Sequence, residues 1–372
     1  MKTDVIKRIF LFLLLLSVAI PLYAETSNIQ RAKVLEILKE EKTTILEDFS
    51  NGGIESLNQT LSAEIIDGAE KGKQVELEND YIKLKKGDLF FIEKGELDGS
   101  ELYSVKERDR QIPILLLLLI FASIILIFSG KQGIRSLISL TGSFLVIAYV
   151  LLPLLMKGYS PILVSIVVAT IILFFAIYFT HGFNRESSVA FSGTIIAVIL
   201  TGLLAVFAVS LMNLTGFETE EATFLQVGSA IKLNFHGLLL GGILIGVLGI
   251  LDDIAVTQSA VVSEIYQSVS HLKPREVYKK AMRVGKEHVS ALVNTLVLAY
   301  AGASLPLLLL FSNSEYSGGL IISLELFSAE IVRTMVGSIG LVLTVPITTL
   351  IAVYFLKGYK GKSALGSHTH SH

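Results

Sequence analysis

Two adjacent acids, Asp252 and Asp253, follow a glycine-rich apolar segment that begins at His236 and reads HGLLLGGILIGVLGILDD. A carboxylate in the hydrocarbon core of a bilayer is costly unless it is paired, hydrated or protonated. Two carboxylates here therefore indicate a site that binds a cation, carries a proton or holds a metal. The alternative is that the acids mark the inner end of a span, because they come about 16 residues, or roughly 25 Å, after His236. The apolar stretch IAVTQSAVV that follows them favours burial.

The glycines before these acids form two rows at helical spacing. The first row is Gly237 and Gly241, and the second is Gly242, Gly246 and Gly249. Rows of small residues let two membrane helices approach closely. Counting four residues on from Gly249 reaches Asp253, so we predict that Asp253 faces a neighbouring helix rather than lipid. Ser259, seven residues after Asp252, adds a hydroxyl oxygen on the face of that acid.

Polar groups in two later apolar segments could complete such a site. Asn294 lies near the middle of the first segment and needs a partner across a helix interface. The stretch from Gly302 to Pro306 predicts a break in the same helix, because proline removes a backbone hydrogen bond. Glu330 and Arg333, three residues apart, begin the second segment. The simpler alternatives are a structural hydrogen bond, a harmless kink and an interfacial ion pair.

The composition is that of a polytopic membrane protein. The chain has 372 residues, of which 52% are hydrophobic, and a mean hydropathy of +0.66. Runs such as IPILLLLLIFASIILIFSG are long enough to cross a bilayer as a helix. The net charge of −2 implies no nucleic-acid partner, and the absence of cysteine excludes disulfides, thiolate metal sites and thiol nucleophiles.

The N-terminal part predicts a secreted β-domain. Residues 1–24 have the basic, apolar and small-residue regions of a signal peptide cleaved after Ala24, with an uncleaved anchor helix as the alternative. Residues 25–110 alternate apolar and polar side chains between turn signals, which predicts short strands. We expect them to form a small extracytoplasmic β-barrel or sandwich.

The remainder, residues 111–358, predicts an α-helical membrane domain of about seven transmembrane helices. The segments fall at about 112–130, 135–156, 161–180, 188–212, 236–262, 288–311 and 334–356. With this number, four basic stretches all fall on the cytoplasmic side, as the positive-inside rule requires. These stretches are GKQGIR, THGFNRESS, YQSVSHLKPREVYKKAMRVGKEH and LKGYKGK.

Three further segments are not simple spans. Residues 219–233 are amphipathic at helical spacing and predict an interfacial helix on the outer face. Residues 318–333 are apolar but carry charges, which is typical of a re-entrant or surface segment. The cytoplasmic tail, 359–372, ends in HTHSH, whose histidines could bind a transition metal, although adventitious binding is the simpler explanation.

The chain resembles the YibE/F family of bacterial multi-span membrane proteins over almost all of its mature length. The resemblance rests on the stretches KKGDLFFI, GGILIGVLGILDDIAVTQSA, NTLVLAYAGASLPLLLL and EIVRTMVGSIGLVLTVPIT. The family pattern has an acid followed by small hydroxyl residues after the glycine-rich helix. Asp253, Ser259 and Ser263 match that pattern, and Asp252 is an additional acid. The resemblance implies the architecture and the bacterial cell membrane rather than a reaction.

The leading hypothesis is a transporter or permease-like protein for an ion or small solute. Its site would lie between the fifth, sixth and seventh spans and use Asp252, Asp253, Ser259, Asn294, Glu330 and Arg333. The main alternative is a membrane-anchored scaffold or receptor whose β-domain binds a partner. An enzyme is not expected, because no HExxH motif or Ser/Lys dyad is visible and spans two to four offer only Glu186, in a loop. We expect no cofactor; the expected partners are the lipid bilayer, a cation or small solute, and a second copy of the chain.

Overall fold

The computed structural model describes residues 28–45, 54–97, 100–228, 233–269, 271–312 and 315–358. The predicted signal peptide and the histidine-containing tail lie outside these residues. The chain divides into two compact units, Met1–Phe128 and Ser129–His372. Helix α2, Gln111–Val146, runs through the boundary between them, and its backbone is non-helical at Gly130.

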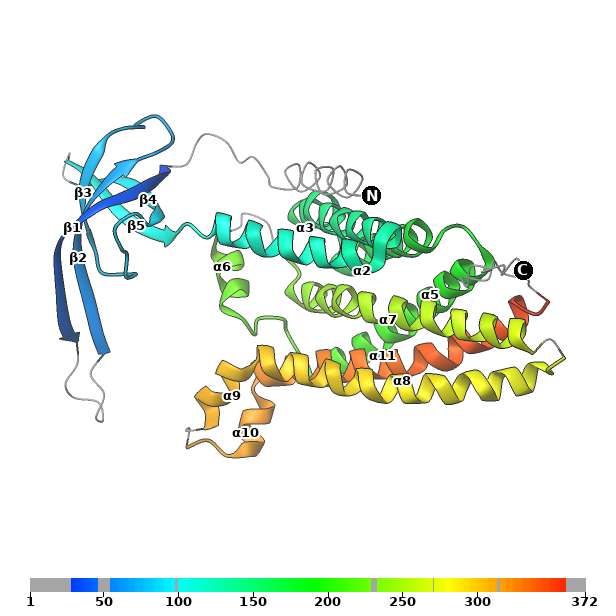
Figure 1. Cartoon of the computed structure of the whole chain (residues 1–372). Coiled ribbons are helices and arrows are strands. Elements are labelled where there is room, and N and C mark those ends of the chain that lie inside the picture. Colours follow the sequence, from blue (N-terminus) through cyan, green and yellow to red (C-terminus); the bar gives the residue numbers. More distant parts are fainter. Residues whose placement is uncertain are drawn as a thin grey trace, which may run out of the picture. The chain divides into compact units, whose positions relative to one another are not determined.

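The first unit contains one five-stranded antiparallel sheet (Figure 1). Its strands are β1 Ile29–Ile45, β2 Ile54–Ile65, β3 Gln74–Asn79, β4 Leu89–Leu97 and β5 Ser100–Arg108, in the order β3-β2-β1-β4-β5. Alternate residues such as Leu61, Ala63 and Ile65 are fully buried, as the period of two requires. The predicted β-domain is therefore present.

This sheet curls into a half-barrel rather than a closed barrel or a sandwich. Register shifts after Val34 and after Ile37 bend β1. Its residues 29–33 pair with β4, and its residues from Ala32 onward pair with β2. The curl brings the sheet edges β3 and β5 together. Lys73, just before β3, donates hydrogen bonds to Glu101 and Tyr103 of β5, each at 2.7 Å.

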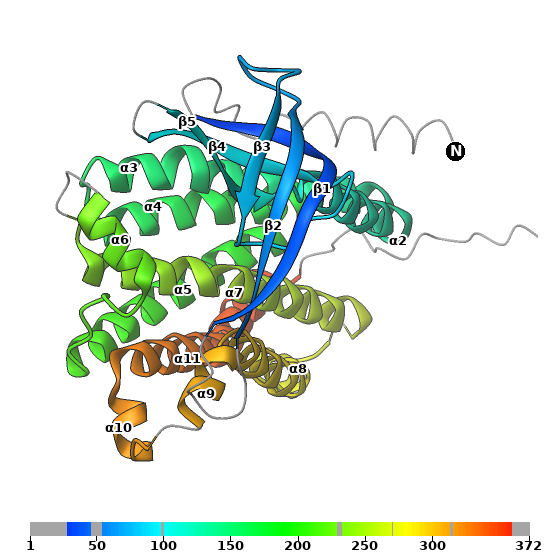
Figure 2. The same ribbon diagram turned by 90° about the vertical axis from the view of Figure 1, so that its left-hand side faces the viewer.

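The second unit is helical. After α2 come η1 Ile147–Leu151, α3 Leu152–Met156, α4 Pro161–Phe174, η2 Phe175–Phe179, α5 Arg185–Leu211, α6 Glu220–Gly228, α7 Phe235–Ser268, α8 Pro274–Ala303, α9 Leu305–Ser312, α10 Gly318–Ser323 and α11 Glu325–Phe355. Helix α7 packs against α4, α5, α8 and α11, and Figure 2 shows it beside the last three. Asn184 and Asn234 cap α5 and α7 by accepting backbone N–H bonds from Ser187 and Gly237.

Within the described residues, five helices are long and apolar enough to cross a membrane, or six if a bent pair counts as one span. The bent pair is α8 and α9, which meet at 62° where the break before Pro306 was predicted. The longest of the five, Gln111–Met156, contains both of the first two predicted spans and the break at Gly130. The apolar helices are thus confirmed, whereas seven crossings and their orientation stay predictions.

Two of the segments with mixed character have a defined structure. Helix α6 covers the first part of the predicted interfacial helix, and its Phe224 and Val227 side chains are exposed. Residues 318–333 divide between the short α10 and the first turns of α11. The last long helix therefore begins at Glu325, earlier than the predicted start of the last span at residue 334, and Glu330 and Arg333 belong to it.

Candidate functional site

Asp252 and Asp253 lie near the middle of the 34-residue helix α7. The helix continues past them to Ser268, because the residues that follow keep an apolar face against the core. Ile254 and Ala255 are both almost fully buried there. The acids therefore do not mark the end of the helix.

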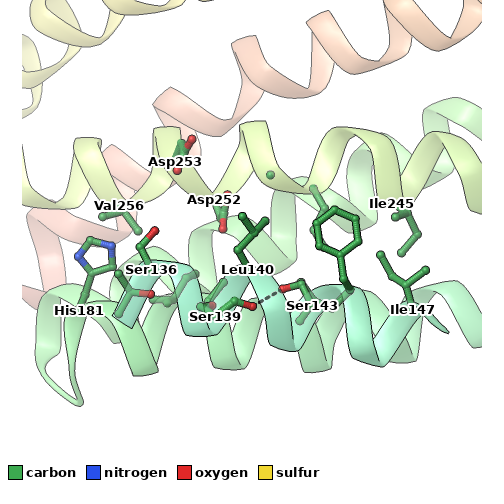
Figure 3. Close-up of a pocket in the computed structure, with 17 residues that line it drawn as sticks. Ser136, Ser139, Leu140, Ser143, Ile147, His181, Ile245, Asp252, Asp253 and Val256 are labelled. Atoms are coloured by element: carbon green, nitrogen blue, oxygen red, sulfur yellow. Dashed lines mark hydrogen bonds between the residues drawn. The ribbon is translucent and has the colours of Figure 1, made fainter. Parts of the chain in front are cut away.

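A cavity of about 400 Å³ lies beside the acids, between α2, the end of η2 and α7 (Figure 3). Helix α2 contributes the hydroxyl residues Ser136, Ser139 and Ser143, and Thr180 and His181 follow η2. Ser139 is buried, and its carbonyl accepts a hydrogen bond from Ser143 Oγ at 3.0 Å. These polar residues give one side of the cavity several oxygen atoms, while apolar side chains line the rest.

Both acids line this cavity, and Asp252 is the more buried of the two. Its Oδ1 atom is fully buried and has no hydrogen-bond partner in the described part of the chain. Figure 3 shows its side chain directed from α7 toward α2. A buried carboxylate oxygen without a donor is unfavourable unless a proton or a cation compensates it.

Asp253 does not have the position that the glycine spacing predicts. Its side chain is exposed and points in a different direction from that of Asp252 in Figure 3, although it also lines the cavity. A Cβ atom added at Gly242 or Gly249 would meet nothing within 4 Å, and one at Gly246 would meet only Tyr300 Oη of α8 at 3.4 Å, so the second glycine row makes no close helix contact. His181 and His288 are near enough to Asp253 to interact with it electrostatically.

The first glycine row does make the predicted close helix contact. A Cβ atom at Gly241 would approach Ser165 Oγ of α4 to 2.5 Å, and one at Gly237 would lie 3.1 Å from Pro161. Adjacent positions on a helix point about 100° apart, so only one of two neighbouring rows can face α4. The first glycine row packs against α4, and Asp253 belongs to the second row.

Ser259 binds the start of α5 rather than an ion. Its Oγ donates to the Glu186 carbonyl oxygen at 2.9 Å, and Ser263 Oγ donates to Glu186 Oε1 at 2.5 Å. The sequence predicted that Glu186 lies in a loop, but it belongs to the first turn of α5. These bonds join α7 to α5, so the hydroxyls after the acids have a structural role here.

The other three predicted residues lie away from the cavity. Asn294 is exposed on α8, and no partner for its side chain is found among the described residues. Glu330 and Arg333 form a direct ion pair near the start of α11. None of these three, nor Ser259, lines the cavity. The structure therefore separates the predicted site and places the cavity beside α2 and η2 instead of between the last three spans.

Sequence reasoning missed the serines of α2, although a signal was present. Ser136, Ser139 and Ser143 recur at helical spacing and so share one face. Nothing in their spacing showed that this face lies beside Asp252. Within the described residues, no group of three or more His, Cys, Asp or Glu side chains could hold a metal ion.

Comparison with known proteins agrees with the apolar helices in indicating a membrane protein. No curated protein and no solved structure matches the chain. The family model described as YibE/F-like protein matches residues 117–358, which is more than half of the chain and includes the whole cavity. The chain belongs to the YibE/F-like protein family.

Proposed function

We propose that the protein is a membrane transporter, or permease-like protein, for an ion or small solute. The observation that carries this proposal is the buried and unpartnered Asp252 Oδ1 beside a cavity with hydroxyl residues. Carboxylate and hydroxyl oxygens are hard ligands that suit small cations, and a carboxylate without a partner can also carry a proton. We propose no enzymatic activity and no cofactor.

The proposed orientation follows from charge. The four basic stretches would face the cytoplasm with the C-terminus, and the β-domain would lie outside the bacterial cell membrane. In this orientation Asp252 would lie between the cytoplasmic and the outer surface of the membrane. Opening its cavity to each side in turn would move a bound ion across the bilayer. Helix α7 packs closely on α4 at Gly241, and this contact would hold α7 in place while the cavity opens and closes.

The test is solute flux in proteoliposomes that contain the full chain, screened over ions and small metabolites. Asp252→Asn keeps the shape of the side chain and removes its charge, so we expect flux to fall at least about tenfold, which corresponds to about 1.4 kcal/mol. Glu264→Gln is the matched control, because Glu264 is an exposed acid of the same helix that does not line the cavity, and this variant should retain most of the flux.

Two further measurements make the result decisive. Equal helical content and thermal stability in the two variants would show that loss of flux is not loss of folding. Ser139→Ala, which changes the cavity without touching the charge, should alter the apparent affinity for the solute. Undiminished flux in Asp252→Asn would refute the assignment of the site.

A scaffold or receptor remains the second candidate because the β-unit has a groove of about 830 Å³. Acids from three of its five strands or the turns beside them line this groove, together with Lys39; the acids are Glu41, Glu76, Glu78, Asp80 and Glu101. Such a surface suits a basic partner. If this function is the right one, cellular function should survive Asp252→Asn and fail in a variant in which Glu76 and Glu78 are replaced by Gln.

A further inference from the structure

A second group of charged side chains lies near the start of α11, apart from the Asp252 cavity. It consists of Glu218, in the connection between α5 and α6, with Glu330 and Arg333 of α11. Arg333 Nη1 contacts Glu330 Oε1 directly, whereas its Nη2 is 3.7 Å from Glu218 Oε1. The longer distance permits electrostatic attraction but is too great for a hydrogen bond.

Glu218 is the unusual member of this group. Its side chain is only 7% exposed, and its Oε2 atom is buried without a hydrogen-bond partner among the described residues. A buried carboxylate normally has its oxygen atoms occupied by donors. One oxygen of Glu218 therefore lacks the donor or cation that a buried carboxylate needs.

The connection that carries Glu218 is held in place by its neighbours. Glu325 Oε1 accepts the backbone N–H groups of Thr215 at 2.5 Å and Gly216 at 2.8 Å. The ring of Phe217 packs on that of Phe235, with centroids 4.2 Å apart. Glu218 is thus held against α11 by contacts on the residues before it, which preorganises its carboxylate.

The charges of the three side chains do not balance. Two carboxylates and one guanidinium leave one negative charge, and all three side chains are at most about one quarter exposed. Tyr300 of α8 is near enough to Arg333 and Glu330 to interact with both, but a neutral phenol does not supply the missing positive charge. Uncompensated charge away from water is unfavourable, so a bound cation would stabilise this arrangement.

We infer that Glu218, together with Glu330 and Arg333, forms a binding site for a monovalent metal cation of the sodium type. A single positive charge makes the group neutral. A divalent ion would leave an excess charge and would be repelled twice as strongly by Arg333. This inference does not depend on the proposed transport function, because the site uses none of the residues of the Asp252 cavity.

The test is thermal unfolding of the full chain in detergent while NaCl replaces choline chloride at constant ionic strength. We expect Na⁺ to raise the Tm of the natural protein, because a ligand that binds only the folded state stabilises it. Glu218→Gln should remove this shift or weaken the apparent Na⁺ affinity at least roughly tenfold. Glu220→Gln, which changes an exposed acid at the start of α6, is the matched control and should keep the shift.

Two further experiments show whether Na⁺ binds at Glu218 or at the Asp252 cavity, and whether a Glu218 variant has lost its stability instead of its Na⁺ site. Asp252→Asn should keep the Na⁺-dependent shift, and a shift that disappears in this variant would assign the ion to the other cavity. Direct binding of radioactive Na⁺ to Glu218→Gln and Glu218→Asp tests the site even if the Tm of one variant is already low. Equal Na⁺ binding by Glu218→Gln and the natural protein would overturn the inference, as would stabilisation by low pH or Ca²⁺ in place of Na⁺.

Discussion

Thr201 of α5 lies directly over Gly340 of α11, where a Cβ atom would come closer than 3.0 Å to the threonine hydroxyl. About two turns along, the relationship is reversed, because Thr348 of α11 lies over Gly193 of α5. Both threonines are fully buried. The two helices therefore run antiparallel and fit into each other at two points, as small residues permit in membrane bundles.

The first prediction concerns this contact. Gly340→Ala should lower the Tm, with a loss of roughly 1–3 kcal/mol, because the added methyl group overpacks the interface. Gly242→Ala is the control, since a Cβ atom there meets nothing within 4 Å, and it should be neutral or slightly stabilising through helix propensity. Adding Thr201→Ala to Gly340→Ala should recover part of the loss. Without such recovery, the proposed contact would not explain the instability.

A second prediction concerns the turn that leads from α5 toward Glu218. Gly216 has a φ of 84°, and a Cβ atom there would come closer than 3.0 Å to the carbonyl oxygen of Phe235. Gly182 has the same φ of 84° but open space around it. Replacement by Ala should therefore destabilise the protein at both positions through backbone strain, and considerably more at Gly216. Similar Tm values for the two variants would show that the backbone at Phe235 can shift to accommodate the added methyl group at little cost.

The third prediction is a pH dependence of the β-unit. Glu101 accepts hydrogen bonds from Lys73 Nζ at 2.7 Å and Lys94 Nζ at 2.5 Å, and these lysines, with Tyr103, hold the pKa of Glu101 at about 2. The folded pKa lies below the ordinary value of 4.5, so the stabilisation is present above pH 4.5 and is lost as the pH falls through about 2.

Hydrogen exchange of the two sheet edges, corrected for intrinsic rates, measures this effect in the full chain. At pH 6, Glu101→Gln should weaken protection in β3 and β5 relative to the natural protein, and the difference should shrink toward pH 2. Because the cluster is exposed, about 1 M salt should also reduce it. Glu36→Gln, an exposed acid of β1, is the control and should leave protection unchanged. A difference that persists at pH 2 would point to a cause other than charge.

Local patterns in the sequence predicted much of the fold. The β-unit follows from alternation, and the break between α8 and α9 follows from Pro306 and the small residues before it. The long helices follow from apolar runs, although the last one begins earlier than expected. These successes share one cause, which is that each depends on residues close together along the chain.

The candidate site could be predicted only in part, because its members come from distant segments. The acids were evident from their place in an apolar helix. The serines of α2 were overlooked, and Ser259 was assigned to an ion although it binds Glu186. Glu218, in the polar connection before α6, gave no signal of its own because its burial depends on α11.

The sequence by itself determined that two carboxylates interrupt an apolar, glycine-rich helix and that a small β-domain precedes the helices. Only the tertiary structure decided which carboxylate is buried. Neighbouring positions on a helix differ by about 100°, so packing that selects one of them must exclude the other. The first glycine row packs on α4, and both acids line the cavity between α2, η2 and α7, where an oxygen of Asp252 is fully buried while Asp253 remains exposed.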